Sequence, residues 1–309
     1  SKVIKILKKH RIDLIHVDYC YGINILRLIT KIPISYNAHN VEGIYWKETA
    51  KNYYKIPIFL RSLYAQYIYL LEKYTIKFVK NINAISYDDK KKFIEIYNIP
   101  EEKIFVNNMG YKKEIFNNPI KQEKAREKLK VDKNKFIVIF HGFYYINLPN
   151  RKAIKIIKDQ ISPRIKDNEI LFLIAGKMPP FKNKKNLKFL GFLDDLRYLL
   201  YAADIAIVPI FRGSGVRIKM IDYLSAKLPM ISTEQANLGL IFENNIHGYI
   251  VSNKEPIEDM INKILELKNN PEKINKIKNN LQKLLEEKYN WDKILKELEK
   301  KYLQILKRT

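Results

Sequence analysis

The sequence contains a single cysteine, Cys20, and therefore cannot close an internal disulfide. An unpaired thiol favours a reducing, cytoplasmic setting. No stretch of about 18 apolar residues occurs, so we expect no membrane-spanning helix. The five histidines lie far apart and lack the spacing of zinc ligands, so we expect no metal site. Glycine and proline are also few, with 10 and 12 residues, and no low-complexity linker divides the chain.

Acidic residues are scarce as well: 33 Asp and Glu stand against 57 Lys and Arg, which gives a net charge of +24. Such a balance favours a polyanionic partner, such as a nucleic acid, an anionic membrane surface or a phosphorylated substrate. No nucleic-acid recognition motif occurs, so we expect no nucleic-acid partner, and an anionic membrane surface is the better candidate. A compositional bias that leaves lysines on a solvated surface would produce the same count.

The most apolar helical pattern runs from Ile56 to Val79 and is interrupted by Arg61, Glu72, Lys73 and Lys77. This pattern is typical of a helix that packs within the protein. An interfacial helix is the second interpretation.

Short apolar runs alternate with longer helical patterns along the 309 residues, a length that suits two domains. The runs are mostly continuous and rich in Ile, Val, Leu and Phe, which is typical of strands buried on both faces of a parallel sheet. Helical patterns fall between many of them, for example Lys152–Lys158, Arg197–Ala202, Arg217–Ala226 and Ile257–Leu267. The last segment, Trp291–Leu306, is predicted to be a long amphipathic helix. The predicted strands are Leu14–Asp18, Ile34–Asn37, Ile82–Ile85, Ile104–Asn107, Phe136–Phe140, Ile170–Ala175, Leu187–Leu190, Ile205–Pro209, Met230–Ser232 and Tyr249–Val251.

Two blocks of alternating strands and helices predict an α/β fold of two doubly wound, Rossmann-like domains facing a cleft. The charged stretch Asn117–Lys133, which contains Pro119, is the predicted seam. We therefore predict a first domain over residues 1–117, a second over residues 118–290, and a closing helix over residues 291–309.

The segment from Asp204 to Leu240 carries the most chemical information. A buried strand is followed by a loop with Gly213 and Gly215, and a helix is predicted to begin near Val216. Glycines before a helix start let backbone N–H groups approach an anion, and the helix dipole favours negative charge there. Cations in the first helical turn oppose that dipole, so a phosphorylated ligand would explain their presence. A loop with solvated charges is the alternative, because glycine-rich loops are weak signals.

Two cations, Arg217 and Lys219, stand in that first turn, and Asp222 follows about one turn later, where a carboxylate could accept the hydroxyls of a ribose. The segment resembles the donor-binding signature of retaining glycosyltransferases of the GT-B architecture, family 4 (group 1) in particular. The closest subgroup is written Gly-x-Gly-x-Arg-x-Lys, followed by an acidic residue and Pro-x-x-x-Thr. The matching residues here are Gly213, Gly215, Arg217, Lys219, Asp222, Ala226, Pro229 and Thr233.

Other segments resemble the same family in the same order along the chain. They include PNRKAIKII after the strand Phe136–Phe140, EILFLIAGK, NLKFLGFLDDLRYLL, VNNMGYKKEIF and NAHNVEGIYW. Trp291 opens a segment similar to the family's last helix, which usually crosses back onto the first domain. The resemblance implies that His39, Arg217 and Lys219 are catalytic. It implies donor binding by Gly142, Phe192, Leu193, Gly213, Ser214, Gly215, Val216, Asp222, Asn237, Leu238 and Gly239.

Two departures from the family pattern stand out. Family 4 commonly carries two glutamates at the positions of Ser214 and Asp222, so one carboxylate is absent and the other is shorter by one methylene. The first strand of the acceptor domain, with its glycine-rich loop, would lie before Ser1. We expect that ~70–100 residues are absent, so that the first domain is incomplete and the chain could bind donor without turning over.

The resemblance implies a hexosyltransferase-type enzyme that moves a sugar from a nucleoside diphosphate sugar to an acceptor hydroxyl with retention, with neither a cofactor nor a metal. The expected acceptor is a glycan or a lipid-linked sugar. The expected setting is surface or cell-envelope glycan assembly in the cytoplasm, peripherally on the inner face of the membrane. The alternatives are a non-catalytic nucleotide-sugar-binding or scaffold subunit, a nucleotide-sugar epimerase on the same fold, and a basic nucleic-acid binder.

Overall fold

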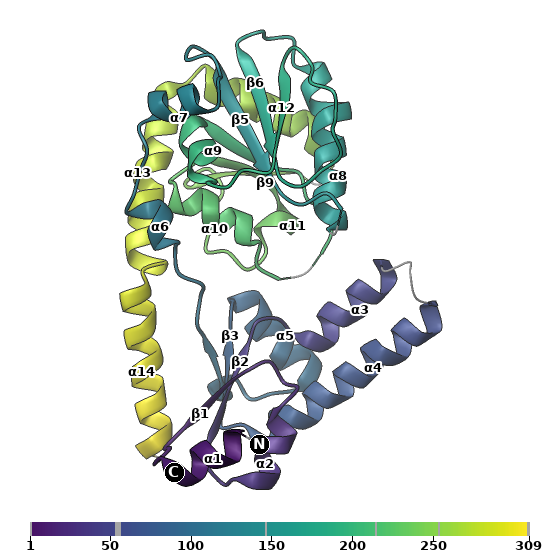
Figure 1. Ribbon diagram of the computed structural model, residues 1–309, viewed down its shortest axis with the longest axis vertical. Coiled ribbons are helices and arrows are strands. Elements are labelled where there is room, and N and C mark those ends of the chain that lie inside the picture. The colour runs from purple at the N-terminus through teal and green to yellow at the C-terminus, as the bar shows by residue number, and fades with distance from the viewer. Residues whose placement is uncertain (1, 53–56, 146, 214, 253, 308–309) are drawn as a thin grey trace. The chain divides into compact units, whose positions relative to one another are not determined.

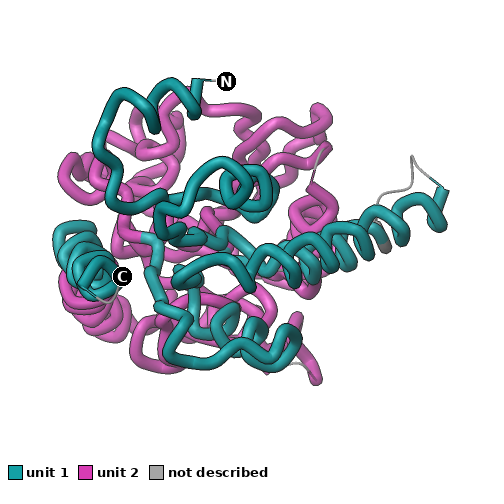
Figure 2. Tube along the Cα trace, turned by 90° about the horizontal axis from the view of Figure 1, so that it is seen from below, with its two compact units in different colours: residues 1–109, 214–216, 291–309 teal, residues 110–213, 217–290 magenta. Residues whose placement is uncertain are grey.

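The ten predicted strands are confirmed, with ends that differ by at most one residue, and they form two separate parallel sheets (Figure 1). The computed structural model describes residues 2–52, 57–145, 147–213, 215–252 and 254–307. The chain divides into two compact units, which Figure 2 shows in different colours. Unit 1 contains Ser1–Met109, Ser214–Val216 and Trp291–Thr309, and unit 2 contains Gly110–Gly213 and Arg217–Asn290.

Unit 1 holds a four-stranded sheet in the order β1-β2-β3-β4. Its strands are β1 (Ile15–Asp18), β2 (Ile34–Ala38), β3 (Asn81–Ala84) and β4 (Ile104–Val106). Its helices are α1 (Lys2–Lys9), α2 (Ile23–Ile29), α3 (Glu42–Asn52), α4 (Ile58–Thr75), η1 (Ile76–Phe78), α5 (Tyr87–Tyr97), η2 (Glu101–Lys103) and α14 (Trp291–Lys307).

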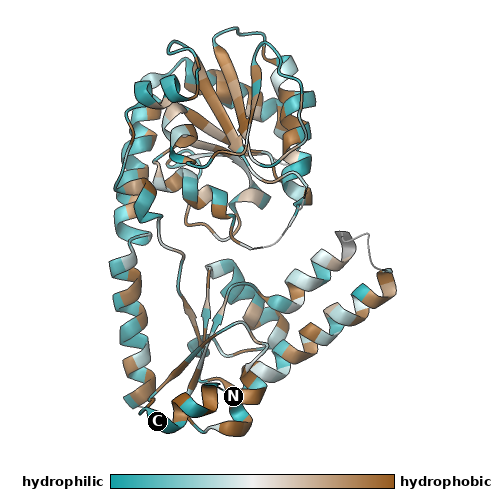
Figure 3. Ribbon diagram, viewed as in Figure 1, coloured by the Kyte–Doolittle hydropathy of each residue, from teal (hydrophilic) through white to brown (hydrophobic). Residues whose placement is uncertain are grey.

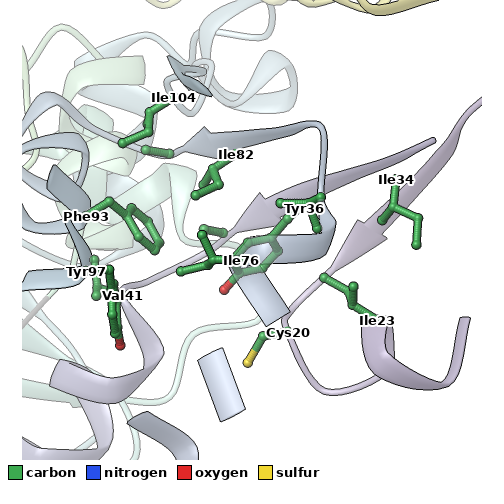
Figure 4. Close-up of a cluster of buried hydrophobic side chains, with 13 residues drawn as sticks. Cys20, Ile23, Ile34, Tyr36, Val41, Ile76, Ile82, Phe93, Tyr97 and Ile104 are labelled. Carbon is green, nitrogen blue, oxygen red and sulfur yellow. The ribbon is translucent and has the colours of Figure 1, made fainter. Parts of the chain in front are cut away.

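One face of this sheet carries the hydrophobic core of unit 1 (Figure 4). Tyr36, Ile82 and Ile104 of neighbouring strands pack there with Ile76 of η1 and Phe93 of α5. The strands of this sheet were predicted to be buried on both faces, but β1 alternates between half-buried and exposed positions. Successive side chains of a strand point to opposite faces of the sheet. The polar residues that alternate with this core therefore lie on the other face.

Tyr302 of helix α14 contacts the polar face of the sheet. The hydroxyl of Tyr302 lies within hydrogen-bond distance of His16 Nδ1 in β1. It also accepts from Asn83 Nδ2 at 3.1 Å and from Ser35 Oγ at 3.4 Å. One hydroxyl therefore ties the last helix of the chain to three strands of the first sheet.

A buried carboxylate joins α4 to the start of α3. Glu72 of α4 is fully buried. Its two oxygens accept the backbone N–H groups of Glu42 and Gly43 at 3.1 and 2.9 Å. They also accept the hydroxyls of Tyr36 and Tyr97 at 2.9 and 2.6 Å. A negative charge at a helix N-terminus is stabilised by the helix dipole, so Glu72 caps α3 from a distant part of the chain.

Unit 2 holds a six-stranded parallel sheet in the order β7-β6-β5-β8-β9-β10, the order of the doubly wound Rossmann fold. Its strands are β5 (Phe136–His141), β6 (Ile170–Ala175), β7 (Leu187–Gly191), β8 (Ile205–Val208), β9 (Met230–Thr233) and β10 (Gly248–Val251). Its helices are α6 (Lys113–Phe116), α7 (Gln122–Lys128), α8 (Leu148–Ile156), η3 (Ile157–Ile161), η4 (Ser162–Arg164), α9 (Arg197–Ala202), α10 (Ile218–Ser225), α11 (Glu234–Asn237), α12 (Pro256–Lys268) and α13 (Pro271–Lys288).

The central strands of unit 2 bear out the continuous apolar pattern. Every residue of β6, β8 and β9 is buried. Local signals set the helix starts beside them: the side chain of Asn147 accepts the N–H of Asn150 at 3.0 Å and begins α8. Asn270 begins α13 in the same way, with Pro271 in the first turn.

Residues 110–117, which were predicted to belong to the first domain, lie in unit 2. The N–H of Lys112 donates to Ser225 Oγ at 2.9 Å, and the N–H of Tyr111 donates to the carbonyl of Tyr289 at 2.8 Å. Both partners belong to unit 2, so this segment packs with the second sheet and its helices.

Candidate functional site

Two chain segments and a helix start gather at the carboxyl edge of the unit 2 sheet, where the strand order reverses. Strand β5 ends at His141 and is followed by Gly142. Its neighbour β8 ends at Val208 and leads through a glycine loop to α10. Doubly wound sheets bind their ligands at this topological switch point, so the fold places the candidate site here.

Lys219 is the second residue of α10, and its side chain turns inward to the end of β5. Its Nζ donates a hydrogen bond to Asn150 Oδ1 and lies 4.2 Å from the centroid of the Phe140 ring. Gly142 makes room for the ammonium group, because a Cβ at this position would lie 2.9 Å from Nζ. The helix N-terminus repels a cation, so an anion bound beside Lys219 would relieve an unfavourable arrangement.

The side chain of Lys219 changes its protonation state near neutral pH. Burial lowers its pKa to about 7, the charge of Arg217 adds to this effect, and Asp222 opposes it. An anion close to Nζ would raise the pKa again, because it favours the charged form. The side chain can therefore take up a proton when it meets a negatively charged ligand.

Arg217 precedes α10 as its N-cap residue, so the helix begins at Ile218, two residues later than predicted. Its Nη2 donates to the carbonyl of Gly213 at 2.6 Å, and Gln235 Nε2 donates to the same oxygen at 2.6 Å. Gly213 and Gly215 have φ values of +111° and +76°, which side chains rarely tolerate. The guanidinium thus lies against the backbone of the glycine loop.

Asp222 lies one turn beyond Lys219 and is buried. Its Oδ1 lies 2.6 Å from Lys112 Nζ, and its Oδ2 lies 3.4 Å from His141 Nε2. Burial raises the pKa of the Asp222 carboxyl, and the hydrogen bond from Lys112 counteracts this. Ribose binding at Asp222 stays a prediction, and a ribose hydroxyl would have to replace one of these two contacts.

His141 stays neutral despite its contact with Asp222. Burial lowers its pKa to about 3, and the charges of Lys219 and Lys112 contribute to the shift. The 3.4 Å contact is therefore a packing contact of a neutral imidazole and not an ion pair. The backbone N–H of His141 donates to Tyr223 Oη at 3.0 Å, which fixes the end of β5 against α10.

The second glycine loop follows β9. Thr233 accepts the N–H of Ala236 at 3.1 Å and donates to the carbonyl of Ile210 in the loop after β8, so both loops are tied together. The predicted donor-binding residues Asn237, Leu238 and Gly239 lie here. Gly239 has φ +82°, and Asn237 Oδ1 is buried without a hydrogen-bond partner among the described residues.

The remaining predicted donor-binding residues are Phe192, Leu193, Ser214 and Val216. Phe192 and Leu193 follow β7. The Phe192 ring is exposed, with Lys177 Nζ 5.4 Å from its centroid, and Leu193 is half-buried. Val216 is half-buried, and Ser214 lies outside the described residues. These contacts test none of the four assignments, which stay predictions.

His39 belongs to unit 1 and follows β2 directly. Its Nε2 lies 3.0 Å from Asp18 Oδ1, and its ring stacks on Tyr19 at a centroid distance of 4.7 Å. Asn37 Nδ2 donates to the same carboxylate oxygen at 2.7 Å. These two hydrogen bonds, Asn37 first, lower the pKa of Asp18. Asp18 therefore orients the imidazole, whose catalytic role stays a prediction.

Sequence reasoning missed three side chains that surround Lys219 and Asp222: Lys112, His141 and Asn150. Asn150 was identified only as part of a family segment. His141 could have been found as a polar residue at the end of an otherwise apolar strand that precedes a glycine. No sequence signal connects Lys112 with Asp222, which lie 110 positions apart in the chain.

Side-chain cations, rather than clustered metal ligands, characterise this edge of the sheet. Arg217 and Lys219 lie at the start of α10, and Lys112 contacts Asp222 farther along the same helix. Over the described ranges of the chain, no three His, Cys, Asp or Glu side chains group as metal ligands. The arrangement can neutralise the charge of a phosphorylated ligand directly.

The close approach of Gly176 to Gly142 allows a test of the packing at this edge of the sheet. Gly176, after β6, has φ +136°, and a Cβ there would lie 2.1 Å from the carbonyl oxygen of Gly142. We expect Gly176→Ala to destabilise unit 2 by about 3 kcal/mol or more, because both backbone and neighbour must shift. Gly191→Ala is the matched control, since it has φ +69° and nothing within 4 Å, and should cost about 1–2 kcal/mol. Equal losses in chemical denaturation would contradict this packing.

Comparisons with known proteins point to one class. Residues 135–270 match the family model described as "Glycosyl transferases group 1", and residues 1–112 match "Glycosyltransferase Family 4". A comparison with curated proteins finds no significant match.

Solved structures share the fold at low sequence identity. HepE of Anabaena in complex with UDP is 16% identical, with a TM-score of 0.76 over 98% of this chain and 81% of HepE. A glycosyltransferase of Rickettsia africae is 20% identical, with a TM-score of 0.73 over 100% and 80% of the two chains. TarM of S. aureus, in complex with Fondaparinux, α-GlcNAc-glycerol and UDP, is 17% identical, with a TM-score of 0.63 over 98% and 58%.

The fold is therefore GT-B, with two Rossmann-like domains. Residues 1–112 form a family 4 glycosyltransferase domain and residues 135–270 a group 1 glycosyltransferase domain, so the chain is a GT-B glycosyltransferase.

Proposed function

We propose that this protein transfers a hexose from a nucleoside diphosphate sugar to an acceptor hydroxyl with retention of configuration, as a member of the Gly-x-Gly-x-Arg-x-Lys subgroup. The observation that carries the proposal is the buried Lys219, held by Asn150 and Phe140 at the switch point of a Rossmann sheet. An anionic partner stabilises a cation buried at a helix start, and a diphosphate is such a partner.

The donor would lie along the carboxyl edge of the unit 2 sheet. Its diphosphate would meet the backbone of Gly213–Val216 and of Gly239, and its base would lie near Phe192 and Leu193. The ribose would reach Asp222. HepE, which shares this fold, was solved with UDP and with UDP-glucose, which supports a uridine nucleotide as the first candidate.

Arg217 and Lys219 would stabilise the charge that builds on the leaving phosphate as the bond between the anomeric carbon and the phosphate oxygen breaks. The acceptor oxygen would form its bond to that carbon from the same face. The departing phosphate oxygen would accept the hydroxyl proton, so no separate base is required. With two side-chain cations in place, we propose that the transfer proceeds without a metal ion.

The acceptor would be a glycan or a lipid-linked sugar, and the setting would be the assembly of surface or envelope glycans in the cytoplasm, peripherally at the inner membrane face. TarM, which was solved with a glycosylated glycerol and UDP, supports an acceptor of this class. The net charge of +24 supports a membrane location, because anionic headgroups attract it.

Titration calorimetry tests the donor site directly. UDP, GDP, ADP and their sugars would be titrated, with a chelator present, into the wild type and into Lys219→Ala. We expect selective binding of one nucleotide diphosphate and a loss of at least about tenfold in affinity in the variant, because a charge-assisted hydrogen bond disappears. Lys133→Ala is the matched control: it removes an exposed lysine near the amino end of β5 and should bind as the wild type does.

The outcomes separate the possibilities. Failure of every nucleotide to bind at millimolar concentration, with the protein folded, would overturn the donor site. Equal binding by the wild type and Lys219→Ala would remove Lys219 from it. Tight binding without transfer to any acceptor would leave a nucleotide-sugar-binding subunit in place of an enzyme.

A further inference from the structure

The outward face of α4 carries an uncovered row of large apolar side chains. Leu60, Leu63, Tyr67, Leu70 and Tyr74 follow one another at steps of three and four residues, which places them on one side of the helix. They are 46%, 63%, 58%, 53% and 54% exposed, respectively. Figure 3 shows the hydrophobic colouring that recurs along α4. We name these five residues the α4 stripe.

The buried face of the same helix explains why this row faces outward. Ala65, Ile68, Glu72 and Thr75 are the buried residues of α4. Glu72 is the only acidic residue of the helix, and its carboxylate accepts the backbone N–H groups at the start of α3. The outward face of α4 therefore contains no carboxylate.

Positive charge lies at the carboxyl end of the α4 stripe. Lys73, Lys77 and Lys80 are exposed at its carboxyl end. Residues 22–80 contain nine Lys or Arg and three Glu, a balance of +6, and two of those glutamates, Glu42 and Glu72, are buried. A partner that approaches this face therefore meets an apolar surface with cations at one end.

The apolar surface continues beyond the end of α4. The rings of Tyr74 and Phe78 contact each other at a centroid distance of 4.8 Å, and Arg27 of α2 lies 5.9 Å from the Phe78 ring. Helix α2 lies beside this end of α4 (Figure 1) and exposes Ile25 and Leu28 to 65% and 86%.

We propose that the α4 stripe, together with the exposed residues of α2, docks on an anionic lipid bilayer. Leucines at the centre would enter the boundary of headgroups and acyl chains, tyrosines suit that boundary because each has an apolar ring and a polar tip, and the lysines would meet lipid phosphates. Within the described residues, no helix combines the length and apolar character needed to span a bilayer.

Charge decides against a second copy of the chain as the occupant. Steps of three and four residues also suit a coiled-coil seam, but such pairing is stabilised by opposite charges beside the seam. Arg61 near the start of the α4 stripe is basic, and Lys73, Lys77 and Lys80 at its end are basic and exposed. Two copies would therefore bring like charges together. The inference rests on the proposed function in one respect: a membrane-docked enzyme would meet lipid-linked acceptors.

Vesicle flotation tests the docking surface with the full chain. The probes are vesicles of pure phosphatidylcholine and vesicles that also contain phosphatidylglycerol. We expect the wild type to float with the anionic vesicles and only weakly with the neutral ones. The double variant Leu63→Glu/Leu70→Glu should bind the anionic vesicles at least about tenfold more weakly, because it places carboxylates in the interface.

The control is Leu295→Glu/Leu303→Glu on α14, where both leucines are 52% exposed in the same unit. This variant should bind vesicles as the wild type does. Nucleotide affinity, measured on all three proteins, reports on the donor site separately and should not change. Equal vesicle binding by all three proteins would overturn the proposal, and so would a failure of the wild type to bind. Loss of self-association in the stripe variant, with unchanged vesicle binding, would make a second copy the occupant.

Discussion

Lys219→Met is expected to lower kcat of sugar transfer about 10²–10³-fold, because it removes a positive charge that is already in place where the leaving phosphate forms. Methionine has a similar length and carries no charge. The variant should therefore fold, since Lys219 is only 9% exposed and the change removes the cost of burying its ammonium group. The measurement is steady-state transfer from the nucleotide sugar that binds best, with Lys133→Met as the control.

The pH profile distinguishes a direct role of Lys219 from a structural one. Its pKa is lowered to about 7 in the unliganded protein. Above that pH the amine is increasingly neutral, so affinity for a nucleotide sugar should fall as the pH rises from about 7 to 9. The diphosphate of a nucleotide sugar has no terminal phosphate that titrates near pH 6. Lys219→Met should bind with the same affinity across this range, and a profile shared with the wild type would exclude the assignment.

Glu72→Ala is expected to lower the free energy of unfolding of unit 1 by about 3–5 kcal/mol, because it leaves buried donors without an acceptor. Two hydroxyls and two backbone N–H groups converge on this carboxylate. Thermal and chemical unfolding of the full chain would report the loss, and hydrogen exchange at Glu42 and Gly43 would locate it at the start of α3.

Glu95→Ala is the matched control for this change. Glu95 lies on α5 of the same unit, its side chain is 57% exposed, and it lies 3.7 Å from Lys91. An exposed pair contributes little, so its removal should change stability by about 0.5 kcal/mol or less. Equal effects of the two substitutions would show that water or a rearranged side chain replaces the Glu72 oxygens.

The sequence alone determined where the strands lie. Helices cover both faces of the unit 2 sheet, so every side chain of strands such as β6 and β8 is buried. Runs such as Ile170–Ala175 and Ile205–Val208 are therefore apolar without interruption and can be identified from consecutive residues. In unit 1 the sequence predicted the strands but not what covers each face of the sheet. His16 alternates with Ile15 and Val17, and the local pattern does not say that Tyr302, 286 positions later, lies on the polar face.

The sequence also predicted Arg217, Lys219 and Asp222 as residues of the candidate site, since their spacing after a glycine loop carries the family resemblance. It did not determine that Asp222 is engaged by Lys112 or that Lys219 is held by Asn150. Those contacts join segments far apart in the chain. The order of the strands brings the end of β5 beside the loop that leads to α10, and so brings Asn150 near Lys219.

The helix α4 shows the same division. Its composition predicted a packing helix with an interfacial helix as the second interpretation, because a run of apolar residues does not reveal which face a neighbour covers. The tertiary structure turned Glu72 inward to cap α3 and left Leu63, Leu70 and their neighbours exposed. Local patterns thus determined the elements of this protein. Contacts between residues far apart in the chain decided which faces were buried, because burial depends on what the rest of the fold places beside each side chain.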